Sequence, residues 1–240
     1  MTDATARQRA YYEATADSYD TADAEREHVV ALHLLAGWIE LAGVKSVLDV
    51  GAGTGRAMRF LKTRFPELVI KGVEPVEALR LQGHSQGIPQ DDLIAGEGTD
   101  LQFPDLCFDL VCEFAVLHHV PQPEGVVAEM TRVAAKMLAI SDCNFMGQGT
   151  PFLRVVKREL WSAGLWPLAD LIKTRGKGYT WSEGDGVAYS YSVFQNLAQI
   201  RTAWEDVNVV ATTPNSHRYL SPLTGAGHVL LLAQKRRGSQ

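Results

Sequence analysis

The stretch Val47–Arg56, VLDVGAGTGR, decides the fold of this 240-residue chain. Apolar residues lead into a glycine-rich turn, and a helical stripe that includes Ala57, Phe60 and Leu61 follows it. This pattern predicts a buried strand, a tight turn and the N-terminus of a helix. Because glycine has no Cβ, the turn can approach a ligand closely, and the free N–H groups of the helix start favour an anionic or polar partner.

Strands and helices alternate over residues 45–142, which predicts a parallel sheet with helices on both faces. FDLVCEF at Phe108–Phe114 is almost continuously apolar, as expected of a strand that is covered on both sides. We therefore predict an α/β fold: a Rossmann-like, seven-stranded, mostly parallel sheet whose last strand is antiparallel. The expected strands are 46–50, 68–74, 92–95, 108–114, 137–141, 206–211 and 228–233.

Two segments lie outside this alternation. Residues 1–27 are polar and contain three tyrosines, so they form either an acidic leader or a lid over a ligand. A cap insertion of helices and loops is expected at about 147–203, and its long loop at 174–193 is of a kind that is usually functional. Residues 28–240 would then form one ligand-binding domain that carries this cap.

Composition limits the partners and the compartment. The net charge is −5 without a basic patch, so a nucleic-acid partner is not expected. Three cysteines without a C-x-x-C pair fit a reducing cytoplasm. Since there is neither a signal peptide nor an apolar run of about 20 residues, no membrane partner is expected. The chain is expected to be a monomer or a homodimer.

The glycine turn is followed by an acid at the end of the next strand. Glu74 stands about 20 residues after the turn, the spacing expected of a carboxylate that binds ribose hydroxyls. In a dinucleotide-binding turn a third glycine would occupy the position of Arg56, where arginine would crowd the contact between helix and strand. A pyrophosphate therefore fits this turn less well than a smaller ligand does.

The motifs VLDVGAGTGR, GVEP and GEGTDLQFPDLCFDLVCEFAVLHHV, together with the later strands, resemble the class I S-adenosylmethionine-dependent methyltransferases. The resemblance covers residues 45–142 in order, and the motifs are specific as a set rather than singly. It implies a Rossmann-like fold, S-adenosylmethionine as cofactor and methyl transfer to an acceptor. The chain lacks the D-P-P-Y-like stretch of the enzymes that methylate bases in DNA, which favours a small-molecule acceptor.

The resemblance also implies roles for individual residues. The first motif would hold the methionine half of the cofactor, Glu74 the ribose, Pro75 and Glu97–Gly98 the adenine, and the end of the fourth strand the methionine amine. The cofactor-binding residues implied in this way are Tyr11, Tyr19, Asp49, Gly51, Ala52, Gly53, Glu74, Pro75, Glu97, Gly98, Glu113 and Phe114. Alternatives remain for three of the acids: Asp49 could instead bind loop amides, and Glu74 and Glu97 could be solvated surface charges.

His118 and His119 follow the fourth strand and are candidate catalytic residues. A histidine at this edge could act as general base for an acceptor hydroxyl or amine, or could only bond the loop backbone. Asp142, after the fifth strand, could contact the substrate or cap a helix. No His or Cys spacing indicates a metal site.

Aromatic residues of the cap are candidate substrate-binding residues, although they could equally belong to the core of the cap: Tyr179, Trp181, Tyr189 and Tyr191. The leading hypothesis is a methyltransferase that transfers a methyl group to an O, N or C nucleophile of a small molecule by in-line displacement. Two alternatives stay open, an NAD(P)-dependent oxidoreductase of Rossmann type and a non-catalytic S-adenosylmethionine-binding protein.

Overall fold

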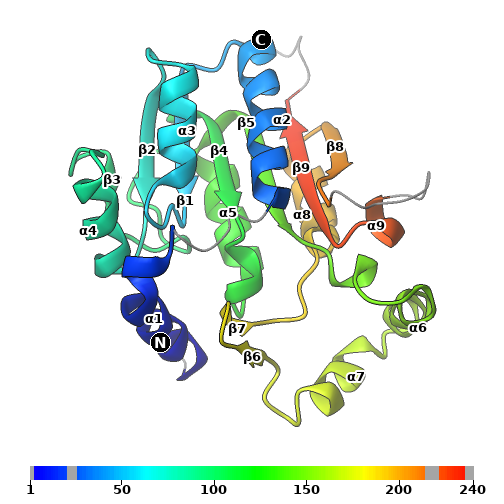
Figure 1. The fold of residues 1–240 in the computed structure, drawn as a ribbon. Coiled ribbons are helices and arrows are strands. Elements are labelled where there is room, and N and C mark those ends of the chain that lie inside the picture. The colour runs from blue at the N-terminus through cyan, green and yellow to red at the C-terminus, as the bar shows by residue number, and fades with distance from the viewer. Residues whose placement is uncertain (1–2, 21–25, 214–221, 236–240) are drawn as a thin grey trace.

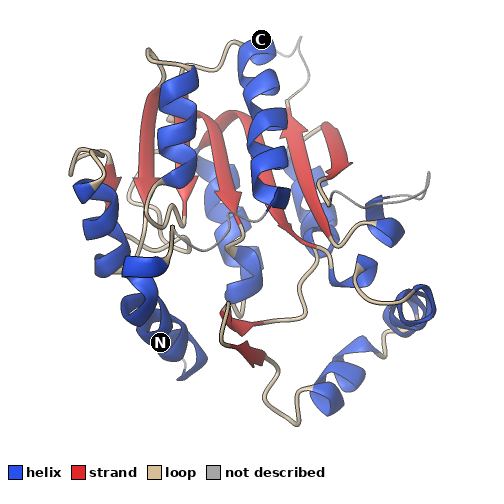
Figure 2. Ribbon diagram, in the orientation of Figure 1, coloured by secondary structure: helices blue, strands red, loops and turns tan. Residues whose placement is uncertain are grey.

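The computed structural model describes residues 3–20, 26–213 and 222–235. In this part of the chain a seven-stranded sheet has the strand order β3-β2-β1-β4-β5-β9-β8 (Figures 1 and 2). Its strands are β1 (Ser46–Val50), β2 (Val69–Val73), β3 (Leu93–Ile94), β4 (Phe108–Phe114), β5 (Ala134–Cys143), β8 (Asp206–Ala211) and β9 (His228–Gln234). The connection expected between the last two strands lies mostly outside the described residues.

The direction of the strands agrees with the prediction. Strands β1 to β5 pair in parallel, whereas β9 pairs antiparallel with both β5 and β8. The predicted α/β fold with an antiparallel last strand is therefore confirmed. Strand β1 has β2 on one side and β4 on the other, so the chain reverses its direction of winding there. Ligands of open α/β sheets bind outside the carboxyl ends of the strands at such a reversal.

Helices cover both faces of the sheet and bury two apolar layers. One layer packs α2 (Arg26–Ala42) and α3 (Arg56–Arg64) on the sheet, with Leu35, Ile39 and Leu61 buried. The other packs α5 (Pro123–Val133) and α8 (Leu197–Ala203), with Val127, Met130 and Trp204 buried. Helix α4 (Glu77–Ser85) packs beside β3. Because these layers hold the sheet rigidly, the loops at its carboxyl edge have fixed positions.

The N-terminal segment and the cap lie at this carboxyl edge (Figure 1). The leader forms a helix, α1 (Asp3–Thr15), although its sequence shows no apolar stripe. The expected loop at 174–193 contains a short antiparallel hairpin of β6 (Thr180–Ser182) and β7 (Gly186–Ala188), which corrects the loop prediction. Helix α1 packs directly on β7, so two segments distant in sequence close over the edge together.

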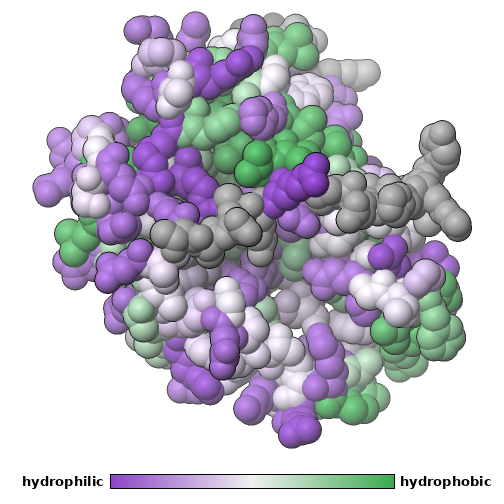
Figure 3. All heavy atoms as spheres, in the orientation of Figure 1, coloured by the Kyte–Doolittle hydropathy of each residue, from purple (hydrophilic) through white to green (hydrophobic). Residues whose placement is uncertain are grey.

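Two cap helices extend away from the sheet. Helix α6 (Pro151–Ser162) begins with Thr150 as N-cap and Pro151 in its first turn, and α7 (Trp166–Lys173) follows it after a turn at Gly164. Only Trp166 of these two helices is buried. In Figure 3, hydrophobic side chains gather at the surface where Figure 1 places α6 and α7.

Candidate active site

The glycine turn and Glu74 form one unit at the carboxyl ends of β1 and β2. Glu74 is 5% exposed, and its carboxylate accepts the backbone N–H of Gly53 at 2.9 Å and of Val76 at 2.8 Å. A carboxylate has about four lone-pair positions, so two acceptor positions remain for a ligand. Gly51, Gly53 and Gly55 all have positive φ, a backbone conformation that favours glycine and lets the turn fold tightly over the strand end.

Further acids lie buried behind the turn. Burial first, and then the charge of Glu74, raise the pKa of Asp49 to about 7. Glu113 is fully buried, and one carboxyl oxygen accepts the Val116 N–H at 2.9 Å, while the other has no hydrogen-bond partner among the described residues. Burial, and then the charge of Asp142, raise the pKa of Glu113 well above its ordinary value. Because raised pKa values favour the protonated forms of Asp49 and Glu113, these buried carboxyls can donate hydrogen bonds as well as accept them.

The N-terminal segment packs against the glycine turn. A Cβ added at Gly53 would lie 3.4 Å from the Tyr19 ring, so this ring rests against the turn. Next to it, Asp20 accepts the Thr54 hydroxyl at 2.7 Å and the Arg59 guanidinium at 3.1 Å. Tyr19 therefore lies against the glycine turn, and its contact with a cofactor stays a prediction.

A pocket of about 300 Å³ opens beside Glu74. Pro75, Gly98 and Phe114 line it, as does Glu97, which is half-exposed and forms an ion pair with Arg9 of α1. Of the other residues implied for the cofactor, Gly51 and Gly53 also line this pocket, whereas Asp49 and Ala52 line a smaller adjoining space of about 80 Å³. Glu113 lies buried behind these cavities.

The two neighbouring tyrosines of α1 have different positions. Tyr11 points toward the hairpin, where its hydroxyl donates to the Glu183 carbonyl and its ring contacts Trp181. Tyr12 lines both this pocket and the larger cavity described below. Tyr12, and not Tyr11, is therefore the tyrosine of α1 that lines the pocket beside Glu74.

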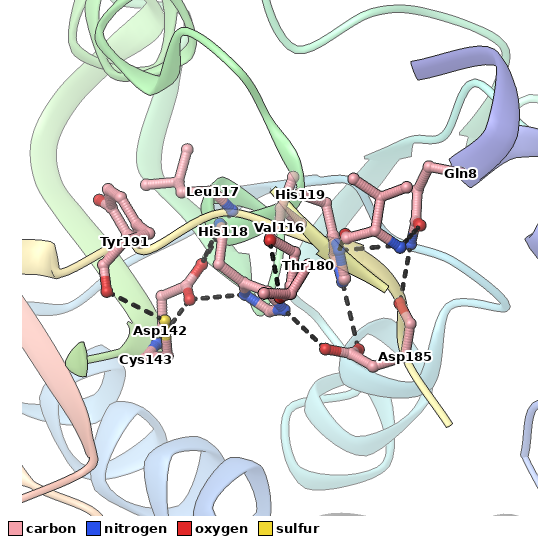
Figure 4. A network of polar contacts seen from close by, with 12 residues as sticks. Gln8, Val116, Leu117, His118, His119, Asp142, Cys143, Thr180, Asp185 and Tyr191 are labelled. Carbon is pink, nitrogen blue, oxygen red and sulfur yellow. Dashed lines mark hydrogen bonds and ion pairs between the residues drawn. The ribbon is translucent and has the colours of Figure 1, made fainter. Parts of the chain in front are cut away.

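His118 is held between two carboxylates (Figure 4). Its Nδ1 lies 2.7 Å from Asp142, and its Nε2 lies 3.5 Å from Asp185 of the hairpin. Asp142 is fully buried and also accepts the N–H of Leu117 at 2.8 Å, which fixes the loop that carries the histidine. Burial lowers the pKa of His118, but the Asp142 and Asp185 carboxylates together raise it well above its ordinary value. Asp142 therefore does two things: it orients the His118 imidazole, and it caps the 3₁₀ helix Leu117–His119 by accepting the N–H groups of Leu117 and His118.

His119 is held by contacts with the hairpin. Its Nδ1 donates to the Val187 carbonyl at 2.6 Å, and its Nε2 lies 3.4 Å from Asp185. Gln8 connects α1 to the hairpin. Its side-chain amide donates to the Asp185 carbonyl at 3.1 Å and accepts the N–H of Val187. Helix α1, the hairpin and the two histidines thus form one connected polar network (Figure 4).

A larger cavity of about 850 Å³ adjoins the pocket beside Glu74. Tyr12, Tyr19, Ala115 and His119 line both spaces, so the two communicate at the end of β4. His118, with Asp185 beside it, faces the larger cavity. The arrangement can therefore bring a second molecule next to a ligand bound in the smaller pocket.

The aromatic residues of the cap are divided between cavity, surface and core. Tyr189 lines the larger cavity, and Tyr179 packs against its ring. Trp181 is 47% exposed and contacts Tyr11 and Arg7. Tyr191 is 2% exposed and donates to Asn196, so it belongs to the core and not to a pocket wall. The expectation that Tyr191 lines the substrate pocket is therefore wrong.

Sequence reasoning missed Gln8, Tyr12 and Asp185. Their partners lie far away along the chain, as the 179 positions between Gln8 and Val187 illustrate. The only local signal was the glycine-rich context of Asp185, in GDG, which indicates a turn.

Two groups of described side chains have ligand atoms close enough to share a metal ion. They are His118, Asp142 and Cys143, and His118, His119 and Asp185. Each histidine contact in these groups joins an imidazole nitrogen to an oxygen, so a proton on the nitrogen satisfies it as an ion pair or hydrogen bond. We interpret both groups as ion-pair networks.

Comparison with known proteins finds similarity to methyltransferases over part of the chain. Residues 48–137 match the protein-family model described as "Methyltransferase domain". Over 98 residues the chain is 34% identical to the phosphatidylethanolamine N-methyltransferase of Cereibacter sphaeroides, covering 38% of this chain and 45% of that protein. Over 109 residues it is 29% identical to a phthiotriol/phenolphthiotriol dimycocerosates methyltransferase of Mycobacterium ulcerans, covering 45% and 40%. The chain spans less than half the length of these curated relatives.

Solved structures share the fold over nearly the whole chain. A possible histamine N-methyltransferase from Thermotoga maritima aligns with a TM-score of 0.59 and 17% identity, over 95% of this chain and 100% of that one. Magnesium protoporphyrin IX methyltransferase from Synechocystis, determined with bound S-adenosylmethionine, aligns with a TM-score of 0.63 and 13% identity, over 98% and 99%. At such identities the likeness is one of fold.

Proposed function

We propose that this chain, whose residues 48–137 match a methyltransferase domain, is a class I S-adenosylmethionine-dependent methyltransferase that transfers the methyl group to a small-molecule acceptor. The observation that carries the proposal is the junction of two cavities at the end of β4. One is lined by the glycine turn and Glu74, and the other is faced by His118. A donor and an acceptor held in these spaces would meet at Ala115, which lines both of them.

The residues of the smaller pocket fit the donor. Glu74 offers its two remaining acceptor positions to the ribose hydroxyls, and Gly98 and Pro75 would contact the adenine. The buried carboxyls of Asp49 and Glu113 would offer further hydrogen-bonding groups on the side of the glycine turn. When bound, S-adenosylmethionine supplies a methyl group that is already activated by its positive sulfur. The protein's main contribution is then to align the acceptor, which can supply about 7–11 kcal/mol of the barrier.

His118 would act as the general base that accepts the proton of an acceptor hydroxyl or amine. In this structure its two nitrogens face Asp142 and Asp185, so the ring already carries a proton on each at neutral pH. Displacement of Asp185 by a bound acceptor would remove one of the two charges that raise the pKa of His118. The imidazolium would then give its Nε2 proton to solvent water in the cavity, and the free Nε2 would take up the proton that the acceptor hydroxyl or amine loses, while Asp142 keeps the ring in its orientation. His119, fixed by Val187, would line the acceptor's path.

The proposal is tested with purified protein, methyl-labelled S-adenosylmethionine and a panel of small hydroxyl, amine and carbon acceptors. We expect label to enter at least one acceptor, with S-adenosylhomocysteine formed in equal amount. His118→Gln should lower kcat for a hydroxyl or amine acceptor while leaving the affinity for S-adenosylhomocysteine unchanged. Tight cofactor binding without transfer to any member of the panel would instead favour a non-catalytic binding protein.

A further inference from the structure

Helices α6 and α7 of the cap expose an unusual amount of apolar surface. Phe152 is 75% exposed, Leu168 58% and Ile172 72%. The exposed apolar residues of this segment are Phe152, Leu153, Val155, Trp161, Leu165, Leu168, Leu171 and Ile172. Contiguous apolar surface on this scale marks an interaction site, since scattered single residues are the norm on monomeric proteins.

Helix α7 has its apolar stripe on the solvent side. Leu165, Leu168 and Ile172 follow one another at steps of three and four, so they share one face of the helix. The opposite face anchors the helix, because Trp166 is 9% exposed and stacks on Phe145 with ring centres 4.6 Å apart. The exposed stripe is therefore held outward by packing on the other side of the same helix.

The same segment is cationic in an acidic protein. Residues 151–178 contain six Lys or Arg residues and two Asp or Glu residues, a net charge of +4, whereas the whole chain has −5. The basic residues are Arg154, Lys157, Arg158, Lys173, Arg175 and Lys177. Two of them make contacts within the protein, Lys157 with the Phe145 carbonyl and Lys173 with the Ser190 hydroxyl. Exposed apolar residues interspersed with Lys and Arg are the composition of helices that lie in a membrane interface.

We propose that α6 and α7 dock this protein on an anionic lipid membrane surface, with the exposed apolar residues entering the boundary between headgroups and acyl chains. Charge complementarity favours this occupant over a second copy of the chain. Two copies meeting through this face would bring two segments of charge +4 together, whereas anionic headgroups attract them. The proposal does not depend on the methyltransferase activity.

Such docking needs no spanning segment. Among the described residues, none of the helices is long and apolar enough to cross a bilayer. The sequence-based expectation of no membrane partner relied on the lack of a long apolar run, and that criterion does not detect amphipathic helices that lie on the surface. Here the apolar residues are separated by basic ones, so they form a face only once the helices have formed.

Sedimentation with lipid vesicles tests the proposal without donor or acceptor. We expect binding to vesicles of phosphatidylcholine and phosphatidylglycerol, weaker binding to phosphatidylcholine alone, and release as salt is raised. Leu168→Ser with Ile172→Ser should weaken binding to the anionic vesicles at least tenfold. Leu41→Ser with Leu81→Ser is the matched control, because these helical leucines are 66% and 57% exposed elsewhere.

Two results would overturn the proposal. One is the absence of binding to anionic vesicles at low salt, or equal binding by the Leu168/Ile172 variant and the wild type. The other is a stable dimer in sedimentation velocity that this variant abolishes, which would show that a second copy covers the face. Calorimetric affinity for S-adenosylhomocysteine, compared between variant and wild type, checks that the variant has kept its fold.

Discussion

At the scale of single residues, Glu74 binds the glycine turn and also faces the pocket beside it. It holds two backbone N–H groups and still has acceptor capacity toward the pocket. Glu74→Gln keeps the shape but removes the charge and one acceptor oxygen. We expect the affinity for S-adenosylhomocysteine, measured by calorimetry, to fall by about 1.5–3 kcal/mol.

Glu97→Gln is the control for this prediction. Glu97 lines the same pocket, but its side chain is 50% exposed and is paired with Arg9. Loss of its charge should therefore reduce the affinity less than the change at Glu74. An unchanged affinity in Glu74→Gln would show that the ribose contact is wrong.

The raised pKa of Asp49 predicts that the stability of the fold depends on pH. Burial raises its pKa to about 7 from an ordinary 3.8. A carboxyl that binds its proton more tightly in the folded chain favours folding at low pH, and this contribution is lost as the pH rises between these two values. In Asp49→Asn the contribution is absent, so the free energy of unfolding should fall less steeply over this range, by up to about 1.4 kcal/mol per pH unit.

Urea unfolding of wild type and variant at pH 5.5, 6.5 and 8 measures the Asp49 effect. The difference between the two proteins isolates this carboxyl from the other titrating groups. Relative to wild type, the variant should be more stable at pH 8 than at pH 5.5. A constant difference across the three values would contradict the raised pKa.

At the scale of elements, the closure of α1 over the hairpin depends on one buried amide. Gln8 is 6% exposed, and its side chain accepts the Val187 N–H and donates to the Asp185 carbonyl. Gln8→Ala would leave both backbone groups without their partner. We expect a loss of about 1–3 kcal/mol of stability and faster hydrogen exchange at the Val187 amide.

Gln102→Ala is the matched control for Gln8→Ala. Gln102 is exposed, and its amide makes one long contact of 3.5 Å to the Asp100 carbonyl. It should change neither stability nor exchange. If Val187 exchanges at the same rate in Gln8→Ala and in wild type, then the hairpin is held by other contacts.

The elements also show what could be read from the sequence. The sheet was predictable because buried strands and amphipathic helices carry their own periodicity, as Phe108–Phe114 does. Helix α1 and the hairpin were not, because α1 has no apolar stripe and each strand of the hairpin has only three residues. What stabilises them is contact with each other, which local patterns do not record.

The same distinction applies to the candidate site. Glu74 and the glycine turn were predictable since both follow strands of one parallel sheet and must meet at its carboxyl edge. The pairing of His118 with Asp185 was not, because that acid comes from the cap and reaches the site only through the hairpin. Likewise, the position of Tyr12 rather than Tyr11 over the pocket depends on how α1 is rotated against the sheet.

At the scale of the whole molecule, ligand binding should stabilise the fold, because the pocket is made by α1 together with loops that follow strands of the sheet. Tyr19 lies against the glycine turn and Arg9 is paired with Glu97, so a ligand between them would join α1 to the sheet. A ligand at 100 times its Kd adds about 2.7 kcal/mol of stability. For a chain of this size the melting temperature should then rise by roughly 5–10 °C.

S-adenosylhomocysteine and NADH distinguish the two cofactor classes in this measurement. We expect the first to raise the melting temperature and the second to leave it unchanged, because Arg56 stands where a dinucleotide-binding turn has its third glycine. Deletion of residues 1–20 should reduce the shift, since Tyr12 and Tyr19 would be lost from the pocket wall. A rise in melting temperature with NADH alone would indicate an oxidoreductase. If the rise with S-adenosylhomocysteine is undiminished after the deletion, the ligand does not contact the N-terminal segment.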